Sequence, residues 1–205
     1  MDKILDRLMP MVAEDDDGSD YAEVMRYGLE LLLMKIFFTA VVIIIGAVTG
    51  CFFETLVFMF LFLPLRENAG GFHASSRTLC LIESVCLVGI VISFIKFDIF
   101  DGTVSLIITA SAALLSTVII FITAPVDCSS RRLDEDEKTV IGRKTRLILS
   151  GEILLAVIGF ILYRVGFSFP LLKISMLSII AAAVLLIMGK IKNSRDKEYN
   201  VPLSE

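Results

Sequence analysis

The sequence has few of the residues that metal, nucleotide and redox chemistry require. It contains one histidine and four cysteines, and the cysteines form no CxxC pair or Cys/His cluster with the spacing of a zinc site. There is no P-loop, dinucleotide-binding fingerprint, internal repeat or low-complexity segment. Carboxylates do not recur along several apolar segments, as they do in ion pumps. We therefore expect no metal, no cofactor and no nucleic acid partner, and the common pump and oxidoreductase functions lose support.

Long polar stretches are also scarce. Hydrophobic residues make up 56% of the 205 residues and the mean hydropathy is +0.83, whereas soluble domains are roughly 45–50% apolar. Apolar runs of about 17–25 residues, long enough to cross a bilayer, recur along the chain. This composition excludes a large soluble domain and predicts a polytopic protein whose main solvent is the lipid bilayer. We expect free thiols in such a reducing or lipid setting.

The N-terminal region is polar and acidic, and it has no cleavage site of small residues behind a short apolar core. We expect no cleaved signal and a retained first span. Apolar residues between Ile4 and Val12 recur at roughly helical spacing, which predicts an amphipathic interfacial helix in the region 1–28. Asp20 followed by Glu23 is typical of a helix start, so the first membrane helix is expected to begin near there.

Residues 36–65 are apolar apart from Glu54 and too many for one ordinary span. We divide this stretch at Gly50. The sequence then predicts an all-α, single-domain protein over residues 1–205, with six transmembrane helices in addition to the interfacial helix. The predicted spans are 29–50, 51–65, 79–97, 103–124, 147–164 and 169–189.

Lysine and arginine residues fix the orientation, because short loops that carry them stay in the cytoplasm. With six spans nearly all of them fall on one side, and the other side holds only Lys96, Arg164 and Lys173. Both termini and the segment 66–78 are then cytoplasmic. If residues 36–65 formed a single span, the N-terminus would move outside, but the segment 64–78 would still share a side with the loop 126–146.

The segment 64–80 departs from the apolar pattern around it. Gly70 and Gly71 allow the backbone to bend or to approach a ligand closely, and His73 is the only histidine. Ser75 or Ser76 can cap the next helix, which would put Cys80 about one turn from its start. A thiolate is favoured at a helix N-terminus and beside a protonated imidazole, and His73 is suited to act as general base and general acid.

Each of these residues also has a structural interpretation. A cysteine at the start of a membrane helix is commonly a small packing residue, as we expect for Cys51, Cys86 and Cys128. A histidine in an interfacial loop is commonly a solvated or capping group. From chemistry alone, the catalytic and structural interpretations of His73 and Cys80 remain balanced.

The residues Arg66, Gly71, His73 and Cys80 form the pattern R-x4-G-x-H-x6-C. This pattern resembles the signature of the accessory gene regulator B (AgrB) family, which are membrane cysteine endopeptidases that process the precursor of a cyclic autoinducer peptide in Gram-positive bacteria. The resemblance extends to the chain length, the six-span layout, the charged amphipathic N-terminus and the basic loop after Ala124-Pro125. It therefore covers nearly the whole chain.

The resemblance implies that His73 and Cys80 are the catalytic pair and that Arg66, Gly70 and Gly71 support the site. It implies an AgrD-like precursor peptide as substrate, which loses an acidic tail and closes a thiolactone or lactone ring. It also implies a homodimer in the cell membrane. Glycines that would allow close packing between helices are Gly46, Gly50, Gly89 and Gly159.

The group that orients His73 is not evident from the motif. Glu83 lies three residues after Cys80, on nearly the same helix face, and Glu54 is a carboxyl within a span. Either is a candidate, although a salt bridge or a buried neutral carboxyl also accounts for them.

Basic residues after the fourth predicted span are candidates for attracting the acidic tail of the precursor. They are Arg131, Arg132, Arg143, Lys144 and Arg146. They also suit a role as positive-inside anchors.

The alternative functions for the whole chain are a peptide transporter or a non-catalytic membrane scaffold. A transporter would need polar residues along a pathway, and only Glu54, Glu83 and Glu152 are available.

Overall fold

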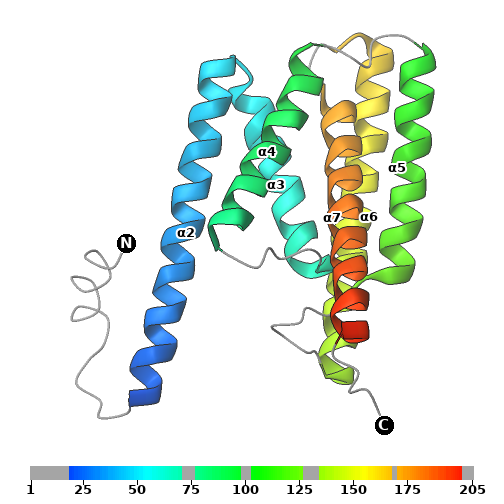
Figure 1. Cartoon of the computed structure of the whole chain (residues 1–205). Coiled ribbons are helices and arrows are strands. Elements are labelled where there is room, and N and C mark those ends of the chain that lie inside the picture. The colour runs from blue at the N-terminus through cyan, green and yellow to red at the C-terminus, as the bar shows by residue number, and fades with distance from the viewer. Residues whose placement is uncertain (1–18, 71–76, 98–102, 127–133, 168–169, 200–205) are drawn as a thin grey trace. The chain divides into compact units, whose positions relative to one another are not determined.

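The computed structural model describes residues 19–70, 77–97, 103–126, 134–167 and 170–199. All regular secondary structure in these ranges is helical, apart from one isolated backbone bridge. The predicted all-α class is confirmed. The helices are α2 (Ser19–Thr49), α3 (Phe52–Ala69), α4 (Arg77–Lys96), α5 (Thr103–Thr123), α6 (Glu135–Val165) and α7 (Leu171–Tyr199) (Figure 1). The predicted interfacial helix in 1–28 lies outside the described residues up to residue 18, and from Ser19 onward the chain belongs to α2.

Four of these helices are long and apolar enough to cross a membrane. Their candidate spans are Val24–Thr49, Val104–Thr123, Asp136–Val165 and Leu171–Arg195. Helices α3 and α4 are not among the four, and α3 carries three charged residues within 18 residues. Four candidate spans are thus established by length and composition, and a total of six stays a prediction.

Two helices are longer than the apolar stretches from which they were predicted. Helix α6 begins at Glu135 rather than near residue 147, and α7 continues to Tyr199 rather than ending near residue 189. The residues added, such as Lys138 and Lys192, are good helix formers. A helix that leaves the bilayer can therefore continue with a polar sequence, because its backbone hydrogen bonds stay within the segment.

By its internal contacts the chain divides into two units, residues 1–44 and 45–205. The first contains most of α2. The second contains the last turn of α2 and helices α3–α7, and α7 lies at its centre. Helix α7 contacts α3, α4, α5 and α6. In its apolar stretch 61% of the residues are buried, against 22% in the apolar stretches of α5 and α6. Small residues on α7, such as Ser178 and Ala182, are fully or almost fully buried, and they let the neighbouring helices approach closely.

The chain turns at Gly50, where the long apolar stretch was divided. Gly50 has a φ of 78°, a conformation that favours glycine, and α3 begins two residues later. A Cβ on Gly46 would lie 2.8 Å from the Thr55 hydroxyl oxygen. Gly46 therefore allows the end of α2 to pack against the start of α3 within the chain.

Gly159 has the same function between α6 and α7. A Cβ on it would lie 2.6 Å from the backbone nitrogen of Leu172. Gly46 and Gly159 were expected to support close packing in a dimer, but their close contacts are within this chain. At Gly50 and Gly89 no described residue lies within 4 Å of a Cβ position. The homodimer itself stays a prediction.

Candidate functional site

The site begins where α3 ends. Asn68 donates a hydrogen bond from Nδ2 to the carbonyl oxygen of Pro64, at 2.8 Å, within the last turns of the helix. Ala69 is the last helical residue, and Gly70 follows with a φ of 77°. L-residues with a side chain rarely adopt this conformation. Gly70 thus stops α3 and sends the chain into the motif segment.

Gly70 also contacts the loop after α5. It forms a parallel backbone bridge with Val126, and the Val126 N–H donates to the carbonyl oxygen of Ala69 at 3.0 Å. A Cβ on Gly70 would overlap the carbonyl oxygen of Val126. The neighbouring Pro125 lies against Gly142 of α6, 3.4 Å from the position of a Cβ there. The end of α3, the loop after α5 and the first part of α6 therefore meet at one end of the second unit.

This end also holds the start of α4 and the end of α7 (Figure 1). The prediction that the segment 64–78 shares a side with the loop 126–146 is confirmed for the described residues Gly70 and Val126. The side of the membrane on which this end lies stays a prediction.

The proposed nucleophile belongs to helix α4. This helix begins at Arg77, so the backbone of Cys80 lies in its first turn, as the sequence predicted. The Cys80 thiol lies outside the described part of the chain, as do Gly71, His73 and both serines that were expected to cap the helix. The pairing of His73 with Cys80 stays a prediction. Arg66 lies in the last turn of α3 and is half-buried.

The two carboxylates that were considered as partners for His73 occupy different positions. Glu83 is half-buried on α4, one turn beyond Cys80, and its carboxyl oxygens are shielded from solvent. Glu54 lies in the first turn of α3, at the end remote from Gly70. Sixteen residues of helix separate Glu54 from Gly70, about 24 Å, whereas the three residues from Gly70 to His73 reach only about 10 Å. This geometry favours Glu83 over Glu54.

Three of the five basic candidates are described, and all three lie on α6 near Gly142. Arg143, Lys144 and Arg146 are exposed. The guanidinium of Arg146 stands 5.2 Å from the ring centre of Phe121 on α5, so it also has a packing role. Arg131 and Arg132 lie outside the described residues. The described basic residues are therefore at the same end of the unit as Gly70.

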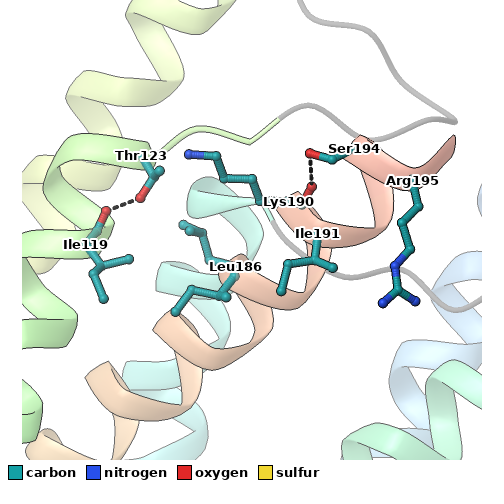
Figure 2. Close-up of a pocket in the computed structure, with 8 residues that line it drawn as sticks. Ile119, Thr123, Leu186, Lys190, Ile191, Ser194 and Arg195 are labelled. Carbon is teal, nitrogen blue, oxygen red and sulfur yellow. Dashed lines mark hydrogen bonds between the residues drawn. The ribbon is translucent and has the colours of Figure 1, made fainter. Parts of the chain in front are cut away.

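Two features were not predicted as sites. A cavity lies between the ends of α5 and α7, and it has Lys190 and Arg195 in its lining (Figure 2). Within the bundle, Glu152 of α6 is 2% exposed and lies near Ser178 of α7, but neither side chain reaches a hydrogen-bond partner among the described residues. The inward direction of Glu152 could not be predicted, because the helix around it is apolar on most of its surface.

The family model described as accessory gene regulator B matches residues 2–189. An AgrB-like protein of Clostridium perfringens is 29% identical over 164 residues, which are 77% of this chain and 75% of the relative. An AgrB-like protein of Listeria monocytogenes is 31% identical over 144 residues, 68% of each chain. The protein FsrB of Enterococcus faecalis is 29% identical over 106 residues, 52% of this chain and 41% of FsrB. No solved structure matches the chain.

Proposed function

Because the chain belongs to the accessory gene regulator B family, we propose that it is a membrane cysteine endopeptidase of quorum sensing. Its substrate is an AgrD-like precursor peptide, from which it removes the C-terminal tail. The observation that carries the proposal is the position of Cys80 in the first turn of α4. Free N–H groups and the positive end of the helix dipole favour the thiolate form of a cysteine at a helix start.

In the first step the Cys80 thiolate attacks a carbonyl carbon of the precursor. The C–N bond of that peptide group breaks, and His73 as imidazolium gives its proton to the departing amine. The tail leaves, and the N-terminal part of the precursor stays on Cys80 as a thioester. Backbone N–H groups at the start of α4 or in the Gly70-Gly71 turn are suited to bind the oxyanion that forms in this step.

In the second step a Cys or Ser of the bound peptide attacks the thioester carbonyl. Its proton passes to His73, the bond to Cys80 breaks, and a thiolactone or lactone ring closes. When the attacking group is a thiol of the peptide, one thioester is replaced by another. The enzyme must therefore mainly hold the nucleophile close and exclude water. A site at the boundary of the apolar helices suits both tasks.

The contact between Gly70 and Val126 gives this site a fixed support. The segment that carries His73 starts from a backbone that is hydrogen-bonded to the loop after α5. Arg66 and Glu83 flank the segment on α3 and α4. We assign them a positioning role, Glu83 as the group that orients His73.

The test is co-expression of the full chain with candidate precursor peptides, followed by mass spectrometry of the peptide products. Wild type is expected to release the tail and form the ring, whereas Cys80→Ala and His73→Ala are expected to leave the precursor intact. Cys86→Ala is the matched control, because Cys86 is an exposed cysteine on the same helix without a role in the mechanism. Equal processing by wild type and Cys80→Ala would exclude the peptidase and leave the transporter or scaffold.

The orientation of the chain in the membrane is proposed from the distribution of its positive charges. Lysines and arginines are abundant at the end where α3 stops and α6 starts, and the few at the other end include Arg164 and Lys173. We assign the former end to the cytoplasm, with both termini and the site on that side of the cell membrane. A C-terminal alkaline phosphatase fusion is expected to be inactive and a green fluorescent protein fusion to be fluorescent. The opposite pair of results would reverse the orientation.

A further inference from the structure

The cavity between α5 and α7 has a volume of about 480 Å³, within the range of about 300–1,000 Å³ that is usual for small-molecule sites. Its lining residues come from the last turns of the candidate spans of both helices. They are Ile119, Thr123, Leu186, Ile187, Lys190, Ile191, Ser194 and Arg195 (Figure 2). None of them was predicted as a site residue, and none has a role in the proposed peptidase mechanism.

The α7 side of the cavity consists of two neighbouring rows of side chains. One row is Leu186, Lys190 and Ser194, and the other is Ile187, Ile191 and Arg195. Residues four apart lie above one another on a helix, so each row begins apolar and ends polar or charged. Figure 2 shows Lys190 extending toward Thr123, with Arg195 beyond Ile191. The cavity thus has an apolar body with one cationic residue on either side of Ile191.

The hydroxyl groups of the cavity are already committed as donors. Thr123 donates to the carbonyl oxygen of Ile119, and Ser194 donates to that of Lys190. Within the described part of the chain, no carboxylate forms an ion pair with Lys190 or Arg195. The donors left to the cavity are therefore the two cationic groups, which favour an anion.

The position along the helices indicates which anion. The candidate span of α5 ends at Thr123 and that of α7 ends at Arg195, so both cations lie at the boundary of the apolar region. Lysine and arginine at such a boundary extend toward the headgroups of lipids. Basic pockets between membrane helices bind anionic lipid headgroups. The apolar rows directly below the cations would contact an acyl chain.

We propose that this cavity binds an anionic phospholipid, with its phosphate between Lys190 and Arg195 and its upper acyl chain along Ile187 and Ile191. A free phosphate ion would leave the apolar rows without a partner. An acidic peptide would bring backbone N–H and C=O groups, for which the described lining offers only hydroxyls that already donate elsewhere. The site is independent of the peptidase function and would hold if that function were wrong.

The test is lipid retention by the full-length protein, purified in detergent and measured by native mass spectrometry during titration with phosphatidylglycerol or phosphatidylcholine. Wild type is expected to bind phosphatidylglycerol and to show little binding of phosphatidylcholine. Lys190→Gln and Arg195→Gln are each expected to weaken phosphatidylglycerol binding about fivefold, since one basic residue near a membrane surface contributes about that factor.

Lys192→Gln is the matched control. Lys192 lies on the same helix between the two cations but does not line the cavity, so its substitution removes one charge without changing the site. Ile191→Trp tests the apolar part of the cavity, because it fills space there without changing charge. It is expected to weaken phosphatidylglycerol binding as well. Circular dichroism of each variant confirms that the helices are retained.

Three outcomes would overturn the proposal. If Lys192→Gln weakened binding as much as Lys190→Gln, the effect would be bulk charge rather than this site. If inorganic phosphate displaced the lipid at equal concentration, the site would be one for free phosphate. If an acidic peptide bound to wild type, lost affinity in Lys190→Gln, and displaced the lipid, the cavity would serve a peptide tail instead.

Discussion

Gly70 and Val126 pair through their backbones, and the carbonyl oxygen of Val126 occupies the place that a Cβ of residue 70 would need. Glycine is therefore required at position 70 for two reasons, the positive φ and the close approach. Because the motif segment follows directly, the direction of the chain toward His73 depends on this contact.

Gly70→Ala is expected to reduce precursor processing about 100-fold, the loss typical of a displacement of about 1 Å at a reacting centre. The alanine costs about 1–3 kcal/mol, because a φ of 77° with a ψ of −166° is a backbone conformation that essentially only glycine adopts, and it also pushes Val126 away. The measurement is the rate of tail release by purified protein in vesicles, with circular dichroism as a check on folding.

Gly50→Ala is the control for that experiment. Gly50 also has a positive φ, 78°, but none of the described residues lies within 4 Å of its Cβ position. Its substitution carries the backbone cost without the contact, so it is expected to lower stability by about 1–2 kcal/mol and to leave tail release nearly unchanged. Equal losses of processing in both variants would mean that backbone strain alone, rather than the contact with Val126, explains the effect.

Gly159→Ala is expected to destabilise the bundle by about 1–3 kcal/mol. Its Cβ would lie 2.6 Å from the backbone nitrogen and 2.9 Å from the Cα of Leu172, so α6 and α7 would have to separate. Gly151→Ala, on the same helix with nothing within 4 Å, should gain up to about 1 kcal/mol from helix propensity. Thermal unfolding in detergent measures both variants, and a loss of stability in Gly151→Ala would contradict the packing argument.

Glu152→Leu is expected to raise the free energy of unfolding by about 1–3 kcal/mol, the desolvation cost of a buried polar group that lacks a hydrogen-bond partner. The Glu152 carboxyl is buried and reaches no hydrogen-bond partner in the part of the chain that the structure describes, and a buried polar group without a partner costs free energy. Glu54→Leu, at a half-buried carboxyl, should change stability less. A lower thermal midpoint for Glu152→Leu would show that this carboxyl contributes to the fold.

The sequence was sufficient for features that depend on length and on backbone chemistry. The stretch 36–65 was too long for one span, and the chain does turn at Gly50. Loop charge and span count placed the motif segment on the same side as the loop after α5, and the contact of Gly70 with Val126 agrees. Both inferences rest on the lengths of apolar stretches and the positions of charged residues, which can be read directly from the sequence.

Inward and outward faces could not be predicted in the same way. In a membrane helix the lipid-facing and buried residues are both apolar, so periodicity carries little information. The apolar windows of α5 and α7 have similar hydropathies, 2.4 and 2.5, yet only α7 is mostly buried. For the same reason the sequence did not indicate that Gly159 packs within the chain, nor that Lys190 lines a cavity.

The last prediction concerns the basic residues of α6. Arg143→Glu with Lys144→Glu is expected to weaken precursor binding about tenfold or more, because two attractive charges become repulsive toward an acidic tail. Both side chains are exposed and follow Gly142, which contacts Pro125 at the end of the unit that holds Gly70. Arg146 is left unchanged because its guanidinium stands over Phe121.

Binding is measured with a labelled precursor and protein in vesicles at two salt concentrations, since an electrostatic contribution weakens as salt rises. Arg164→Glu, at the other end of α6, reverses one charge remote from the site and should leave binding unchanged. If the double variant binds the precursor as wild type does, these residues act only as positive-inside anchors, and the tail is recognised elsewhere.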